Sequence, residues 1–164
     1  MHSLAKTTDQ KARRPEGRRA FTLLEMVAVI AIVAALAAAG VTRFGTGTLE
    51  NVGAEGFARK LALDLMQARR RTIATGDNHY LQMTLAGSNV ASYTMIRRAA
   101  GGDVVVEETR TVATGVTVST SHTTLEFDFG GAALAGYTVT ITGPNRTWTV
   151  STVMTTGAVR TVAS

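Results

Sequence analysis

The feature that most constrains this chain is an apolar segment close to its N-terminus. Residues 26–39 contain no polar or charged side chain. With its flanks the segment covers residues 21–41, and as a helix it would be about 31 Å long, close to the thickness of a bilayer's hydrocarbon core. A helix that is apolar on every side needs a bilayer or a large core around it. A chain of 164 residues offers little protein to cover it, so we predict a membrane-spanning helix rather than a buried core helix.

Most of the net positive charge of the chain lies directly in front of this segment. The formal charge is +5, and residues 1–20 contribute +4 of it, from six basic and two acidic side chains. By the positive-inside rule this flank stays in the cytoplasm and the rest of the chain faces the other side of the membrane. A nucleic-acid-binding domain carries its basic charge on the folded part. The remaining +1 therefore gives DNA binding little support.

One acidic residue, Glu25, interrupts the apolar segment. A carboxylate within a bilayer costs on the order of 3 kcal/mol and usually has a partner. The sequence offers two kinds of partner. Arg18 or Arg19 could reach down one turn to the carboxylate. Alternatively, a cut before Phe21 would create an α-amino group that neutralises Glu25 of a neighbouring copy of such a helix.

The basic leader, the residues Phe-Thr-Leu-Leu-Glu at 21–25 and the apolar run together resemble the signature of type IV prepilins. That family comprises type IV pilins and the pseudopilins of type II secretion. The resemblance implies that prepilin peptidase cleaves between Ala20 and Phe21 and that the new amine of Phe21 is methylated. It also implies that Glu25 guides docking between subunits. The family usually has glycine before the cut, whereas this chain has Ala20, which is small enough that we expect cleavage.

The same residues allow a rival interpretation as an export signal. The pair Arg18-Arg19 resembles a twin-arginine signal, and residues 35–37 (Ala-Leu-Ala) fit a signal-peptidase site. The mature protein would then be an exported soluble β-domain. Glu25 argues against this alternative, because an acidic residue early in an export signal has no evident purpose.

The region after the membrane segment divides into a glycine-rich stem and a second helix. Residues 42–56, together with Gly40, contain five glycines, each of which weakens a helix by up to about 1 kcal/mol. We predict a weak or unwound stem here, either a flexible hinge or a plain linker. From Phe57 onward, Leu61, Leu65 and Ala68 recur at helical spacing and predict one buried stripe. The helix should stop at Gly76, and the arginines at 69–71 suit the helix dipole or a docking or DNA-contact patch.

After Gly76 the apolar residues alternate with polar ones, as in β-strands. Turn residues separate seven or eight short segments, which we predict to form mostly antiparallel sheets. The strands are expected at residues 80–85, 90–97, 104–107, 116–120, 125–129, 137–141, 148–154 and 158–162. The predicted fold class is α+β and pilin-like. The predicted divisions are a leader at 1–20, a transmembrane and assembly helix at 21–41, a stem at 42–56 and a periplasmic helix-plus-sheet domain at 57–164.

Three further segments are similar to one subgroup of the family, the minor pseudopilin H and fimbrial T proteins. They are residues 58–76, the Phe127-x-Phe129-Gly130 segment and the turn at 156–157. The resemblance implies a minor pseudopilin of a type II secretion pseudopilus, anchored by a single helix in the bacterial inner membrane. Its partners would be other pseudopilins or pilins through the N-terminal helix, and prepilin peptidase. A minor type IV pilin that serves pilus assembly or DNA uptake is the alternative.

The sequence offers no basis for catalysis or for a cofactor. Cysteine is absent, and the three histidines have no serine or carboxylate at a catalytic spacing and no metal-ligand spacing. We therefore predict a structural subunit without enzymatic activity and without a metal. DNA binding would need a basic surface built from four scattered arginines, Arg97, Arg98, Arg146 and Arg160.

Overall fold

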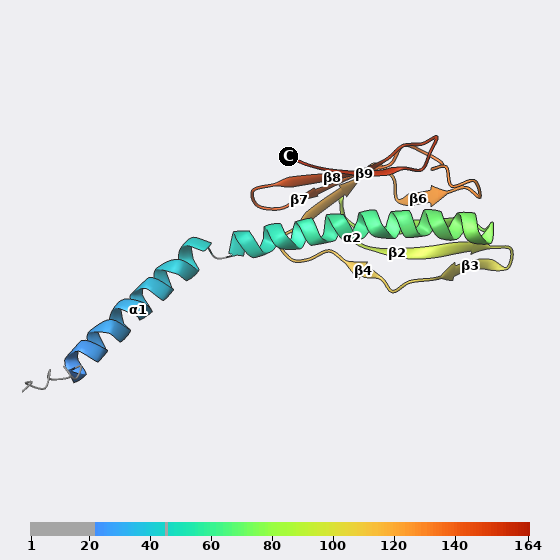
Figure 1. The fold of residues 1–164 in the computed structure, drawn as a ribbon. Coiled ribbons are helices and arrows are strands. Elements are labelled where there is room, and N and C mark those ends of the chain that lie inside the picture. The colour runs from blue at the N-terminus through green and yellow to red at the C-terminus, as the bar shows by residue number, and fades with distance from the viewer. Residues whose placement is uncertain (1–21, 45) are drawn as a thin grey trace, which may run out of the picture. The chain divides into compact units, whose positions relative to one another are not determined.

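The computed structural model describes residues 22–44 and 46–164. The chain divides after Thr42 into two units. The first contains most of helix α1 (Leu23–Phe44), and the second contains helix α2 (Thr46–Thr75) and all nine strands (Figure 1). The predicted α+β architecture of an apolar N-terminal helix, a second helix and antiparallel sheets is confirmed.

Helix α2 begins earlier than the sequence predicts. The expected stem at 42–56 is helical from Thr46, so the prediction of an unwound segment is wrong for that part. Gly47, Gly53 and Gly56 cost helix stability individually, but tertiary packing compensates for them. Ala54 is fully buried, and Gly53 lies against the loop at Ala113, where an added Cβ would be 3.7 Å from the alanine methyl group.

The buried stripe of α2 follows the predicted spacing. Leu61, Leu65 and Ala68 are at most 1% exposed, and Phe57 packs at the border of the core and meets Tyr93 edge-on at 5.6 Å. The helix ends where predicted. Gly76 adopts φ of +77° and donates its N–H to the carbonyl of Thr72 at 2.9 Å, which is a left-handed stop that glycine adopts without strain.

The strands form two antiparallel sheets. The five-stranded sheet has the order β3-β2-β1-β6, and β4 also pairs with β2. Its strands are β1 (His79–Ala86), β2 (Asn89–Ala99), β3 (Gly102–Val105), β4 (Arg110–Thr111) and β6 (Thr124–Phe127). The four-stranded sheet has the order β5-β7-β8-β9. Its strands are β5 (Thr117–Thr120), β7 (Thr138–Thr142), β8 (Thr147–Thr152) and β9 (Val159–Ala163).

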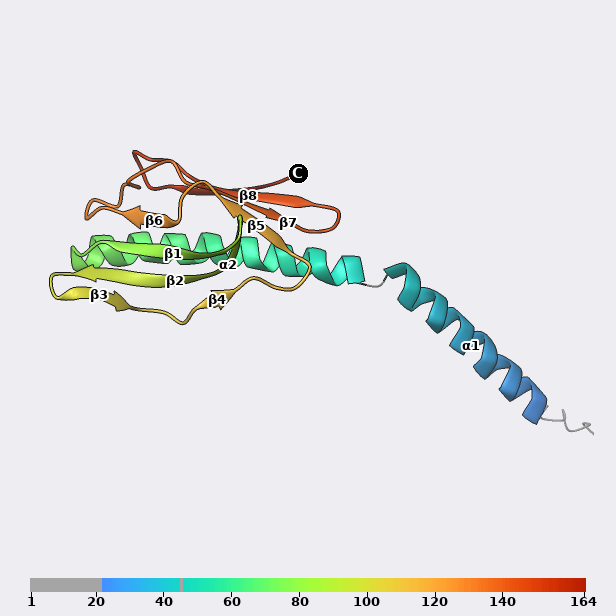
Figure 2. The ribbon, with the colours of Figure 1, turned by 180° about the vertical axis from the view of Figure 1, so that it is seen from behind.

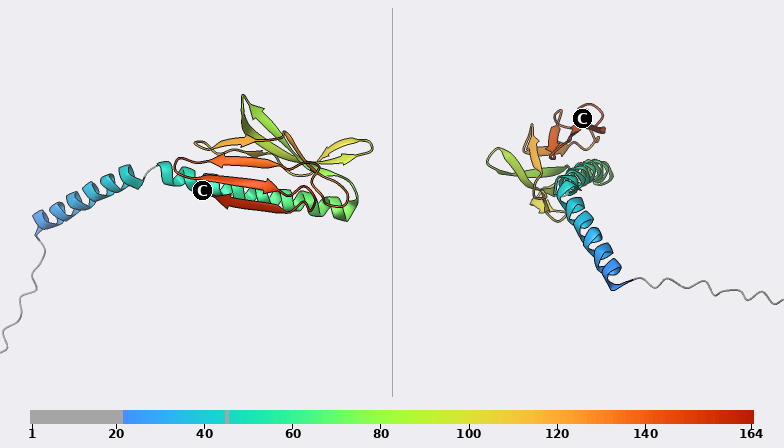
Figure 3. Two further views of the ribbon diagram at one scale, coloured as in Figure 1. Left: turned by 90° about the horizontal axis from the view of Figure 1, so that it is seen from above. Right: turned by 90° about the vertical axis from the view of Figure 1, so that its left-hand side faces the viewer.

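The core lies between α2 and both sheets. Helix α2 is in front of the strands in Figure 1 and behind them in Figure 2, so one face of the helix covers the two sheets; Figure 3 shows the same layers from above and from the end. The residues of strand β8 show how the sequence produces this core. Trp148, Val150 and Thr152 are buried and alternate with half-exposed residues, which is the period of two predicted for this segment.

Three predicted strands, β3, β6 and β8, end two residues earlier in the structure, and the short strand β4 was not predicted. Strand β6 ends at Phe127 rather than at 129, because the carboxylate of Asp128 accepts hydrogen bonds from the N–H groups of Gly130 and Ala132, both at 2.9 Å. This Asp-centred turn replaces strand pairing and leaves Phe129 74% exposed. Strand β3 ends at Val105, so Glu107 lies outside it.

Candidate functional site

The N-terminal end of α1 has one of the two hydrogen bonds of a capping box. Thr22 immediately precedes the helix, and its hydroxyl accepts a hydrogen bond from the N–H of Glu25 at 3.2 Å. The first helical backbone bond follows, from the N–H of Met26 to the carbonyl of Thr22 at 3.1 Å. Threonine before a helix with glutamate three positions later is a recurrent start signal. The sequence analysis missed Thr22, although Thr-Leu-Leu-Glu before an apolar run is readable as this pattern.

The position of Glu25 places a negative charge at the positive end of the α1 dipole. Its side chain is exposed, and among the described residues it forms no ion pair. Of the predicted site residues, Ala20 and Phe21 lie outside the described residues, as do the suggested partners Arg18 and Arg19. Which of these groups meets Glu25 therefore stays a prediction.

Helix α1 has no cover within the part of the chain that the structure describes. Its window from Leu23 to Gly40 is long and apolar enough to cross a membrane, and none of it is buried. This finding contradicts the alternative of a buried core helix. A signal sequence has the same length and composition, so this finding does not distinguish a membrane anchor from an export signal.

Among the polar contacts that hold α2 to the rest of the domain are three made by its charged side chains. In the first, Asp64 is buried and its carboxylate accepts hydrogen bonds from the hydroxyl of Tyr93 and the ammonium of Lys60, both at 2.8 Å. Burial, and then the charge of Asp64, raise the pKa of Tyr93. The helical spacing of the apolar residues did not predict the burial of Asp64.

The second contact is made by Glu107, which lies between β3 and β4. Its carboxylate accepts from Arg71 at 2.6 Å and from Gln67 at 3.0 Å. These residues stand one turn apart on α2, so Glu107 holds the β3–β4 connection against the helix.

The third contact also lies in the C-terminal part of α2. Arg69 donates its Nε–H to the carbonyl of Gly131 at 2.8 Å. Gly157 lies so close that an added Cβ would be 2.0 Å from the same carbonyl oxygen, and its φ is +61°. Arg69 and Arg71 thus have specific tertiary partners rather than the dipole role expected for the arginine triplet, and Arg70 alone of the three points into solvent.

A separate polar cluster lies around Glu126 on β6. Its carboxylate accepts two hydrogen bonds from Arg98, at 2.9 and 3.0 Å, and one from Asn78 at 2.9 Å. Burial alone would raise the pKa of Glu126, but these donors outweigh it and the pKa is lowered. The guanidinium of Arg98 also lies 4.9 Å from the ring centre of Tyr80. Burial, followed by the hydrogen bond that the Tyr80 hydroxyl donates to Asp103, raises the pKa of Tyr80 to about 12.

The four arginines suggested for DNA binding do not form one surface. Arg98 forms an ion pair with Glu126, and Arg97 lies 3.7 Å from the carboxylate of Asp77. As neighbours on β2 they point to opposite faces of the sheet. Arg146 lies in the turn between β7 and β8 of the other sheet, and Arg160 lies on β9 of that sheet. Half of the suggested basic charge is therefore neutralised within the chain.

The described histidines have structural contacts. His79 is buried and its Nδ1 is 2.8 Å from the carbonyl of Asp77, while His122 meets Tyr137 edge-on at 5.4 Å. Across residues 22–44 and 46–164, no three His, Asp or Glu side chains are grouped as a metal site would require.

Comparison with known proteins agrees with this geometry. Residues 17–41 match the family model "Prokaryotic N-terminal methylation motif". The fold is pilin-like. A minor pseudopilin of the type 2 secretion system of Vibrio cholerae, EpsH, matches with a TM-score of 0.58 and 16% identity, over 67% of this chain and 96% of that one. A second structure of EpsH matches at 0.57 and 12%, over 70% and 97%.

A type IV minor pilin of Pseudomonas aeruginosa, FimU, also matches. Its TM-score is 0.55 at 16% identity, over 68% of this chain and 89% of that one. No curated protein matches the chain in sequence. The chain therefore combines a prepilin-type N-terminal motif with the fold of minor pseudopilins and minor pilins. At these identities the structural likeness concerns the fold.

Proposed function

We propose that this chain is a minor pseudopilin, a structural subunit of a type II secretion pseudopilus that supports protein export across the outer membrane. One observation carries the proposal. The chain matches a methylation motif at residues 17–41, the apolar helix that overlaps this motif has no cover in the described part of the chain, and the domain behind it has the fold of EpsH. An uncovered helix of this kind needs lipid or the helices of other subunits around it.

In this proposal the N-terminal residues carry the assembly chemistry. Prepilin peptidase cuts between Ala20 and Phe21 on the cytoplasmic side of the inner membrane, and the new Phe21 amine is methylated. Helix α1 anchors the subunit with its domain in the periplasm. The exposed carboxylate of Glu25 then binds a neighbouring subunit's amine, which offsets the cost of a charge in lipid. The small residues of α1 let neighbouring helices approach closely.

The first experiment is intact-mass analysis and N-terminal sequencing of the full chain from membranes of a host with prepilin peptidase. We expect a chain that starts at Phe21 and carries one methyl group. The same host without the peptidase is the control and should yield the uncut chain. A start at Ala38 would identify an exported soluble domain and overturn the proposal.

The residue before the cut gives a matched variant for this experiment. If the natural chain stays uncut, Ala20→Gly restores the residue usual in the family. Cleavage of that variant alone would show that Ala20 limits processing, and an uncut variant would contradict the prepilin interpretation.

A minor type IV pilin is the second candidate, because FimU shares the fold almost as well as EpsH does. Deleting the chain in its host separates the two. Loss of a secreted protein with normal surface pili supports the pseudopilus, and loss of pili with normal secretion supports the pilin. A role in DNA uptake requires salt-sensitive binding of the full chain to DNA, and the ion pairs of Arg97 and Arg98 argue against it.

A further inference from the structure

A hollow of about 500 Å³ lies between the last turns of α2 and the hairpin of β2 and β3. The valines at 104–106 form its aliphatic part. The other side chains that line it are polar, and they are Arg71, Thr75, His79 and Arg97. Within the described part of the chain, the lining therefore combines cationic and aliphatic groups and contains no acidic side chain.

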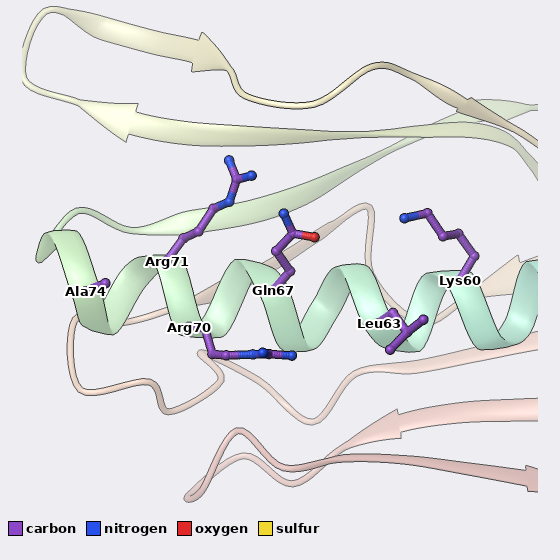
Figure 4. A pocket seen from close by; sticks show the side chains of 6 residues that line it. All are labelled: Lys60, Leu63, Gln67, Arg70, Arg71 and Ala74. Atoms are coloured by element: carbon purple, nitrogen blue, oxygen red, sulfur yellow. The ribbon is translucent and has the colours of Figure 1, made fainter.

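The register of the sheet sets one row of side chains beside this hollow. Arg97 is directly opposite His79 of β1 on one side and Val104 of β3 on the other. Directly opposite residues of antiparallel strands share a face of the sheet, so the three side chains stand side by side. Figure 4 shows Arg71 extending from α2 toward the hairpin of β2 and β3, whereas Arg70 extends to the other side. The hollow thus has a strand row on one side and the end of α2 on the other.

Arg97 is the cation of this row that a ligand can reach. Its guanidinium is 3.7 Å from the carboxylate of Asp77, which is beyond hydrogen-bond distance, and the two side chains are 40 and 45% exposed. Exposed ion pairs of this kind contribute little to stability. The five N–H donors of a guanidinium form a planar fork that fits a carboxylate. A ligand carboxylate can therefore replace Asp77 at small cost.

The surroundings favour a single carboxylate over a polyanion. Glu107 accepts a hydrogen bond from Arg71 at 2.6 Å, and with Asp77 it reduces the positive potential around the hollow. Val104 and Val105 are 45 and 64% exposed, so they offer an aliphatic wall to the stem of a side chain. An acidic side chain carries one charge on such a stem, whereas nucleic acid presents a row of charged phosphates.

Strand β3 also offers backbone groups to a ligand. It is the last strand of its sheet, and in the part of the chain that the structure describes no strand lies along its outer edge. An extended peptide can add to such an edge through main-chain hydrogen bonds while its side chains enter neighbouring pockets. A peptide residue opposite Val104 would extend the row and lie two strand spacings, about 10 Å, from Arg97. Glutamate and arginine side chains together bridge that distance.

We propose that this hollow binds a glutamate side chain of an extended peptide segment from a partner protein. The glutamate carboxylate replaces Asp77 at Arg97, its stem lies against Val104, and the peptide backbone pairs with the outer edge of β3. The site uses only the fold of the domain, so it goes beyond the proposed function and does not depend on it.

The test is NMR of the full chain in detergent micelles, with the capped peptide acetyl-Thr-Val-Glu-Val-Thr-amide as the probe. We expect saturable shifts of the Arg97 Nε–H and the Val104 methyl groups, with a Kd of about 0.1–1 mM. Nuclear Overhauser effects should join the peptide backbone to residues 102–105. The same peptide with glutamine for glutamate should bind about five- to twentyfold more weakly, because it loses a charge-assisted hydrogen bond. Equal binding of the two peptides, or no shift at about 10 mM peptide, overturns the proposal.

Substitutions of Arg97 test its role. Arg97→Gln should remove the preference for the glutamate peptide, and Arg97→Lys should retain part of it, because lysine keeps the charge but not the planar fork. Arg160→Gln makes the same charge change on β9 of the other sheet and should bind like the natural chain. Trp148 fluorescence verifies that each variant is folded. A folded Arg97→Gln variant that still prefers the glutamate peptide would contradict the proposal.

Two further outcomes identify the occupant and separate the two proposals. If a DNA duplex shifts the Arg97 and Val104 signals at lower concentration than the peptide does, an acidic peptide is the wrong occupant. A chain that is cut at Phe21 but does not bind the peptide overturns this inference alone. A chain that binds the peptide but is not cut overturns the proposed function alone.

Discussion

The two helices of this chain have opposite relations to the rest of the molecule. Helix α1 is apolar along its length and buries none of its membrane-length window within the chain. Helix α2 is rich in charges and glycines, yet it buries a continuous stripe against two sheets. The more hydrophobic helix is therefore the one without cover, which shows that α1 is built for an environment outside the chain and α2 for one inside it.

This contrast predicts which substitutions will change the stability of the domain. A change on α2 alters the free energy of unfolding of the domain, because its neighbours are present in the same chain. A change on α1 should leave this free energy unchanged, because the described part of the chain does not cover that helix. Trp148 is the single tryptophan and is buried in β8, so its fluorescence follows unfolding of the domain and not of α1.

The largest expected difference is between two leucines. Leu65→Ala on α2 should lower the free energy of unfolding by about 2–5 kcal/mol, because it leaves a cavity in the core. Leu36→Ala on α1 should leave it unchanged, since Leu36 is exposed. Urea unfolding of the full chain in detergent, followed by Trp148 fluorescence, measures both. An equal loss in the two variants would show that α1 packs on the domain.

The next effect concerns two carboxylates of α2. Asp64→Asn removes a buried charge that accepts from Tyr93 and Lys60, and should cost about 1.5–3 kcal/mol. Glu55→Gln removes only an exposed pair with Arg59 and should cost less than about 0.5 kcal/mol. The same unfolding experiment applies. Similar small losses would mean that water reaches Asp64 as readily as it reaches Glu55.

The sequence predicted the helices and strands better than it predicted the polar contacts that hold them together. Periodicity alone located the α2 stripe, the alternation of β8 and the stop at Gly76. It placed the start of α2 too late, because glycine propensity is a local property whereas the burial of Ala54 depends on the fold. The partners of Glu107 and Glu126 come from segments 36 and 48 residues away, and no local pattern brings such residues together. The N-terminal motif at residues 17–41 could be recognised because its residues are consecutive.

A smaller effect, and one that depends on pH, compares Glu126 with Glu25. The folded domain lowers the pKa of Glu126 below its ordinary value of 4.5. The ionised carboxylate therefore stabilises the fold fully above about pH 4.5, and this contribution disappears as the pH falls through the folded-state pKa. Arg98 is 50% exposed, so solvent weakens the pair and we expect Glu126→Gln to cost about 1–2 kcal/mol at pH 7.

The difference between the natural chain and the Glu126→Gln variant should shrink between pH 5 and pH 3, as measured by urea unfolding at each pH. Glu25→Gln on α1 is the matched control and should leave the unfolding curve of the domain unchanged at every pH. A difference at Glu126 that stays constant down to pH 3 would contradict the coupling of its ionisation to folding.

The smallest effect tests whether the glycine-rich start of α2 is helical in solution. Gly56 is a helical residue with no atom within 4 Å of where a Cβ would be. Gly56→Ala should therefore raise the free energy of unfolding by about 0.5–1 kcal/mol, because alanine loses less backbone entropy on entering a helix. Gly40→Ala is equally free of contacts but lies on α1, where it should not change the Trp148 transition. A loss of stability in Gly56→Ala would indicate that residue 56 lies in an unwound stem, with a backbone conformation that alanine cannot adopt. A gain at Gly56 with none at Gly40 would show that this glycine is tolerated because the sheets hold α2, whereas α1 depends on partners outside the chain.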